Sequence, residues 1–132
     1  MENEFEEKFD ALLRDFTQLR LGDWSEEEQE KMEKMMMYEY ISKSMPNLAS
    51  QWNGEYSQAL LKRYTELLLG DWSEEMQAKV AKWIKYTYIS KLKPNLLRHW
   101  NAKYPQAKQE VVNLIREIKA LNDQVVANRN KS

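Results

Sequence analysis

Few residues in this sequence could support acid–base, nucleophilic or metal chemistry. The single histidine, His99, lies in no metal-binding or catalytic motif, and the 132 residues include no cysteine. Neither an HExxH motif nor a GxSxG motif nor a phosphate-binding glycine loop occurs. Because no nucleophile stands beside a base, we predict a protein that is not an enzyme, with no catalytic residue, no cofactor and no metal.

Two acidic turns are the remaining candidates for chemistry. The sequence LGDWSEE occurs at residues 21–27 and again at residues 69–75. Grouped carboxylates can bind a cation, but Asp and Glu in the first turn of a helix also stabilise the helix dipole. We therefore interpret both turns as helix caps, with Asp23 and Asp71 as the N-cap residues and Ser25 as the alternative.

These turns belong to an internal repeat that covers most of the chain. At an offset of 48 residues, residues 11–58 and 59–106 are identical at 27 of 48 positions, without a gap. Self-similarity at a fixed period indicates a repeat architecture. Within each copy the apolar residues recur at steps of three and four, which predicts amphipathic helices.

The repeat predicts an all-α fold in a single domain, residues 1–132. Proline at positions 46 and 94 ends a long helix in each copy and begins a short one. A C-terminal helix is expected over about residues 105–126. The predicted architecture is a helical bundle of about five long helices, built from two tandem 48-residue helical-hairpin repeats plus that C-terminal helix, around a pseudo-two-fold or solenoid-like axis.

Charge is distributed unevenly along the chain. Residues 1–53 carry 13 acidic and 6 basic side chains, whereas residues 54–132 carry 8 acidic and 14 basic ones. The two halves are expected to attract each other, within one chain or head to tail between chains. No stretch approaches the roughly 18 apolar residues of a membrane span, and the acidic N-terminus is unlike a signal peptide. We therefore expect a cytoplasmic protein with no membrane contact.

The second long helix of repeat 2 supplies the candidate interaction surface. Lys79, Lys82 and Lys85 follow one another every three residues, and Met37 is the residue of repeat 1 equivalent to Lys85. That equivalence predicts that Met37 is exposed. Lysines at this spacing can neutralise phosphates, so nucleic-acid binding is the alternative function. The isoelectric point near 5.9 argues against it.

Other apolar residues are assigned to the core by comparing the copies. Met35 and Met36 align with Trp83 and Ile84, which are ordinary core residues, so both methionines are predicted to be buried. Four tryptophans occur at equivalent positions of the two repeats, and we predict that their side chains are buried against the core and anchor the loops there. They are Trp24, Trp52, Trp72 and Trp100.

The last helix contains a heptad seam that permits two interpretations. Its apolar residues follow steps of 3, 4, 3 and 4, and they are Val111, Leu114, Ile118, Leu121 and Val125. The seam either forms a homodimer or is buried against the chain's own bundle, which we favour. The function predicted from the whole sequence is a non-catalytic protein–protein interaction module, such as a small adaptor, inhibitor or regulatory protein, whose partner is another protein.

Overall fold

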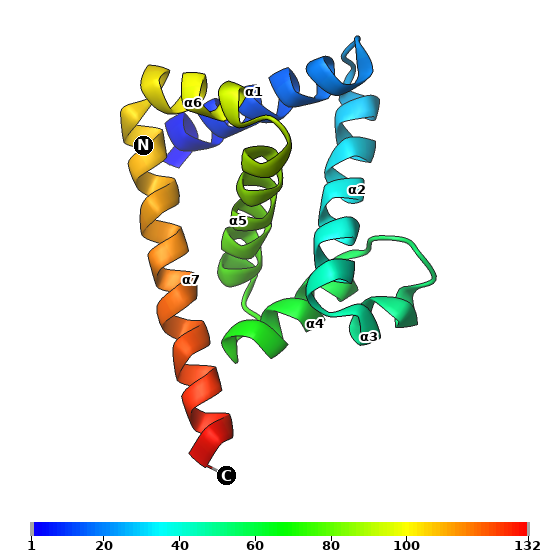
Figure 1. Ribbon diagram of the computed structural model, residues 1–132, viewed down its shortest axis with the longest axis vertical. Coiled ribbons are helices and arrows are strands. Elements are labelled where there is room, and N and C mark those ends of the chain that lie inside the picture. The colour runs from blue at the N-terminus through cyan, green and yellow to red at the C-terminus, as the bar shows by residue number, and fades with distance from the viewer. Residues whose placement is uncertain (1, 132) are drawn as a thin grey trace.

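The computed structural model describes the backbone of residues 2–131 and the side chains of residues 4–131, and this part of the chain consists of helices and short connections. Five long helices and two short ones are present, which confirms the predicted bundle (Figure 1). Their bounds are α1 (Glu2–Leu21), α2 (Glu26–Ser44), α3 (Pro46–Ala49), α4 (Gln58–Leu69), α5 (Glu74–Leu92), α6 (Pro94–Lys103) and α7 (Pro105–Lys131), with a 3-10 turn η1 (Ser50–Trp52) after α3.

The two repeats pack through their central helices. Figure 1 shows α2 and α5 running in opposite directions, with α1 across one end of the pair and α4 across the other, and α2 contacts α5. The ring of Phe16 contacts Tyr88, and the equivalent residues of the other repeat, Tyr64 and Tyr40, also interact. The repeats are therefore related by an approximate two-fold axis, while α7 runs along α4 and α5.

The turn that opens each central helix corrects the predicted N-caps. The hydroxyl of Ser25 accepts a hydrogen bond from the backbone N–H three residues later, at 3.1 Å, and Ser73 does the same at 3.3 Å. Asp23 and Asp71 instead accept backbone N–H groups inside the loop. The prediction of aspartate caps is wrong because the helix begins two residues later, where the serine is the half-helical residue. The glycine before each loop has a φ of 78° or 72°, which suits a helix C-terminus.

A single hydrophobic core extends through both repeats. Leu12 and its equivalent Leu60 are both fully buried, as are Ile41 and Ile89. Equivalent buried threonines also repeat one bond, since each hydroxyl donates to the carbonyl four residues earlier at 2.7–2.8 Å. The duplicated sequence therefore produces duplicated packing.

Two methionines of α2 have the opposite exposure from the one predicted. Met37 is buried, with 2% of its surface exposed, whereas Met35 is 40% exposed. Successive residues of a helix are about 100° apart, so these two lie on either side of the buried Met36. The buried arc extends toward Met37 because α2 packs against α5 as well as α1. Both predictions were therefore wrong.

The four tryptophans at equivalent positions of the two repeats do not behave alike. Trp100 is buried, as predicted, and its indole N–H donates to the carbonyl of Lys8 at 2.8 Å. Trp24 and Trp52 are half-buried. Trp72 is 50% exposed, so the prediction was wrong for this residue.

The heptad seam of α7 is largely internal. Val111, Leu114 and Ile118 are buried in the core, and Leu121 and Val125 are half-buried. α7 contacts α1, α4, α5 and α6. The later part of the seam lies near the end of α4, since Asn122 donates to the carbonyl of Leu68. The intermolecular interpretation is therefore contradicted for the three buried residues, and the favoured one is correct there. None of the helices in the described part of the chain combines the length and apolar character that crossing a bilayer requires.

Candidate functional site

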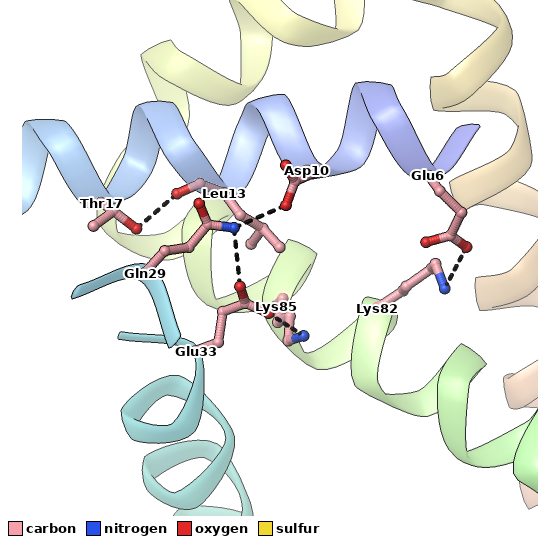
Figure 2. A network of polar contacts seen from close by, with 8 residues as sticks. All are labelled: Glu6, Asp10, Leu13, Thr17, Gln29, Glu33, Lys82 and Lys85. Carbon is pink, nitrogen blue, oxygen red and sulfur yellow. Dashed lines mark hydrogen bonds and ion pairs between the residues drawn. The ribbon is translucent and has the colours of Figure 1, made fainter. Parts of the chain in front are cut away.

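The lysines of the predicted interaction surface are held in ion pairs. Lys82 on α5 binds Glu6 of α1 at 2.8 Å, and Lys85 binds Glu33 of α2 at 2.7 Å (Figure 2). Only 17% of each lysine side chain is exposed. The acidic first half and the basic second half of the sequence therefore pair within one chain at these two places.

Lys79 is also paired, with one carboxylate of α7 and one of its own helix. Its ammonium group lies 2.9 Å from Glu117 of α7 and 3.2 Å from Glu75. The hydrogen bond that Lys79 donates to Glu117 raises the pKa of Lys79, so the ammonium form is favoured. Together the three lysines form no free basic face, and Met37 is buried rather than exposed, although Met37 and Lys85 both line the groove described next.

The structure instead forms a groove between the repeats that sequence reasoning missed. It has a volume of about 750 Å³ and is lined by side chains from α1, α2, α4 and α5, by Trp24 just before α2 and by Tyr56 just before α4. Five carboxylates and three cationic side chains line it. The carboxylates belong to Asp10, Glu26, Glu30, Glu33 and Glu74. We call this feature the inter-repeat groove.

A buried amide fixes the wall of the groove in repeat 1. Gln29 is 6% exposed, and its amide N–H groups donate to Asp10 at 2.9 Å and to Glu33 at 3.0 Å (Figure 2). Its carbonyl oxygen accepts the indole N–H of Trp24 at 2.7 Å. Because each polar atom of this buried amide has a partner, the side chain has one defined position.

Repeat 2 builds the same support from the equivalent residues. Gln77 is also 6% exposed, donates to the backbone carbonyl of Trp72 at 2.7 Å and accepts from Gln58 at 2.8 Å. Gln58 stands at the position equivalent to Asp10 in repeat 1. In each repeat, therefore, a buried glutamine of the central helix connects the helix before it, α1 or α4, to the loop that contains Trp24 or Trp72.

The two long walls of the groove differ in chemistry. Glu30 and Glu33 line it from α2, whereas the equivalent residues of α5 are Ala78 and Ala81. The middle of the α2 wall therefore presents carboxylates where the middle of the α5 wall presents small apolar side chains, and Glu74 and Lys85 place charges only toward the two ends of the α5 wall. The sequence held a signal for this feature, because these positions are among the few where otherwise similar central helices change from charged to apolar.

Aromatic side chains complete the lining. The guanidinium of Arg14 lies over the ring of Trp24, 4.3 Å from its centre, in a cation–π arrangement. Tyr56 also lines the groove, and burial raises its pKa to about 12, so its hydroxyl is neutral at physiological pH. Among the described residues no group of three or more His, Cys, Asp or Glu side chains is arranged to hold a metal ion.

Comparison with known proteins gives a family and one relative. The chain is 49% identical over 56 residues to "Uncharacterized protein YusU" of Bacillus subtilis (strain 168), a match that covers 42% of this chain and 59% of that protein's length. No solved structure matches the chain. The family model described as "Protein of unknown function (DUF2573)" matches twice in tandem, at residues 3–60 and 57–128, so that each match contains one repeat. The chain therefore belongs to this family, with two tandem copies of the family's unit.

Proposed function

We propose that this chain is a non-catalytic protein–protein interaction module, such as a small adaptor, inhibitor or regulatory protein, that binds its partner in the inter-repeat groove. The observation that carries the proposal is one groove of about 750 Å³ to which both repeats contribute. Buried amides and a tryptophan hold its ends in place. Preformed concave surfaces of this size are typical of binding sites. The proposed compartment is the cytoplasm, which the lack of cysteine supports.

The shape and lining of the groove favour a polypeptide partner. Lining residues run along α2 from Glu26 to Met37 and along α5 from Glu74 to Lys85. Eleven helical steps correspond to a length of about 16 Å. An elongated groove of this length suits a chain segment, and aromatic residues beside charged ones are common in protein interfaces.

Nucleic-acid binding is the weaker candidate. The lysines on which that alternative rested are engaged by carboxylates of the same chain. The groove itself is lined by more carboxylates than cationic groups, and these repel phosphate. No observation in the described residues favours this second function over the first.

An affinity pull-down with matched variants tests the proposal. The wild-type chain, Glu30→Lys and Glu27→Lys would be used as baits in the native lysate, with and without nuclease, followed by mass spectrometry. Each variant breaks one exposed ion pair of α2, with Lys34 or Lys31, but only Glu30 lines the groove. We expect a protein partner that survives nuclease, is kept by Glu27→Lys and is lost with Glu30→Lys. Recovery of nuclease-sensitive material alone would contradict the proposal.

A further inference from the structure

We propose that the occupant of the inter-repeat groove is one amphipathic helix of a partner protein, with Lys or Arg side chains along one side. Its cationic side would face α2, and its apolar side would pack on α5. This inference rests on the proposed function, because it names the chemistry of the partner that the groove is proposed to bind.

The charge of the groove calls for a cationic occupant. Of its three cationic side chains, Lys85 and Lys34 are bound by Glu33 and Glu30, and Arg14 lies over an indole ring. Glu26 and Glu74, which line the groove from the first turns of α2 and α5, take part in none of the ion pairs of the described residues. The helix dipole stabilises both carboxylates, but neither is paired with a cationic side chain in the described residues, and a partner carrying Lys or Arg would supply one.

The opposite wall calls for an apolar, closely packed occupant. Ala78 and Ala81 are three residues apart, so they lie on one face of α5, and both line the groove. Side chains of this size allow a helix to approach α5 closely, because the distance between packed helices depends on the residues at the contact. Leu61 of α4 extends the apolar lining. A chain with cationic residues on one side and apolar residues on the other is an amphipathic helix.

The length and asymmetry of the groove set the stoichiometry. About 16 Å accommodates about three turns of helix. Although the repeats are related by an approximate two-fold axis, the axis exchanges an acidic wall for an alanine wall. The two halves of the groove are therefore not equivalent, and one helix binds in one orientation. We expect one peptide for each chain rather than two.

Titration of a synthetic helix tests this inference directly. The probe is a fluorescein-labelled peptide of 14 residues with leucines on one face and lysines on the other, and its control has glutamates in place of the lysines. Fluorescence anisotropy would be measured at low and at high salt. We expect one-to-one binding of the lysine peptide, at least about tenfold weaker binding of the glutamate peptide, and weakening by salt because the contacts are ionic.

Two variants separate the groove from general attraction to an acidic protein. Glu30→Lys should weaken lysine-peptide binding about tenfold, whereas Glu27→Lys, which makes the same charge change outside the groove, should change it less than twofold. Ala78→Glu adds negative charge but obstructs the apolar wall, so it should also weaken binding. If Ala78→Glu binds as well as the wild type or better, the attraction is non-specific and the inference is wrong. Circular dichroism would confirm that each variant is folded.

The remaining outcomes distinguish this inference from the function on which it rests. If the lysine peptide does not bind, while Glu30→Lys still loses a partner in the pull-down, the groove binds proteins but not a cationic helix. If Glu30→Lys affects neither peptide nor partner, both proposals fail. If sedimentation shows a dimer of the wild type that Glu30→Lys dissociates, the occupant is a second copy of this chain, and the helix proposal is overturned.

Discussion

Because the two repeats are related by an approximate two-fold axis, each residue pair at their interface has an equivalent pair, and one such pair differs from its equivalent in charge. At one place Glu33 of α2 binds Lys85 of α5 at 2.7 Å. At the equivalent place, Ala81 of α5 stands in the position of Glu33, and Met37 of α2 stands in the position of Lys85. A two-fold interface between identical modules would contain one residue pair twice. Here the acidic residue is on repeat 1 and the basic residue is on repeat 2, so the charges match between the two different repeats and would not match between two copies of one repeat.

The core shows the opposite behaviour. Leu12 and Leu60 are equivalent, identical and fully buried. Close packing restricts such positions to one size and shape, whereas an interface groove tolerates a change of charge if its partner changes too. The buried positions that do differ, such as Met36 and Ile84, exchange one apolar side chain for another, whereas Glu30 and Glu33 of the inter-repeat groove are replaced by alanine in the other copy. Changes of charge therefore occur where the two repeats face each other, and that is where the candidate site lies. The following variants test the comparison, from the largest expected effect to the smallest.

The largest effect is expected where α7 packs on the second repeat. Ile118→Asp should unfold the protein, because it places an unpaired charge at a position that is only 3% exposed, at a cost of about 4 kcal/mol or more. Circular dichroism and gel filtration would measure the loss of structure. Val126→Asp, on the same helix at a position 44% exposed, should change stability by less than about 0.5 kcal/mol. A folded monomer with Ile118→Asp would mean that the seam is intermolecular.

The next test addresses the equivalence of the two cores. Leu12→Ala and Leu60→Ala should each lower the free energy of unfolding by about 2–5 kcal/mol, because each leaves a cavity at a fully buried site. The two losses should agree within about 1 kcal/mol. Urea denaturation measures both. A much smaller loss in one variant would indicate that its repeat relaxes around the cavity and that the cores differ.

A third test converts one side of the interface into a copy of the other. Lys85→Met alone should lower the free energy of unfolding by about 1–3 kcal/mol, because it leaves the largely buried carboxylate of Glu33 without its cation. The double variant Glu33→Ala with Lys85→Met reproduces the Ala81 and Met37 pair, so it should recover part of that loss; recovery is incomplete because Glu33→Ala also leaves one N–H of the buried Gln29 amide without its acceptor. Thermal and urea unfolding of the three proteins measure the recovery. No recovery would show that the two places are not equivalent in packing.

The smallest effect at neutral pH is expected at the pair Phe16 and Tyr64, which are equivalent and both buried. Burial raises the pKa of Tyr64 to about 12. Below pH 10 its hydroxyl is neutral in both states, so Tyr64→Phe should cost there only the hydrogen bond between Tyr64 and Ser44, about 1 kcal/mol. Above pH 10 the unfolded state ionises first, and the free energy of unfolding falls with a slope of up to about 1.4 kcal/mol per pH unit from this group until the folded pKa is reached.

Unfolding curves between pH 9 and pH 12 measure this slope. In the Tyr64→Phe variant the decline above pH 10 should be shallower than in the wild type. It should not vanish, because burial also raises the pKa of Tyr56 and Tyr88 to about 12. An unchanged slope would mean that Tyr64 ionises as readily in the folded as in the unfolded state.

Local sequence patterns were sufficient for much of the fold. The repeat, the helical spacing and the prolines at positions 46 and 94 predict the five long helices and two short ones, because each signal acts within a few residues. Exposure at the edges of a helical face was harder to predict. Periodicity gives the centre of the buried arc on α2, but whether Met35 or Met37 extends it depends on the direction of α5.

The candidate site depends on contacts that no local pattern contains. The ion pair of Lys82 joins it to Glu6, which is 76 residues away, so a free basic face could not be distinguished from a neutralised one. The inter-repeat groove exists only after four helices meet. Comparing Glu30 with Ala78 could have located it, because a charge lost between two similar copies marks a change in surroundings.

Joining the two repeats in one polypeptide affects how the groove depends on protein concentration. Only the residues between η1 and α4 connect the first module to the second. Two separate modules would dissociate on dilution, but a short tether keeps the local concentration of one module around the other in the millimolar range. The inter-repeat groove therefore stays assembled even when the protein is scarce, and the binding that we propose for it would depend only on the amount and affinity of the partner.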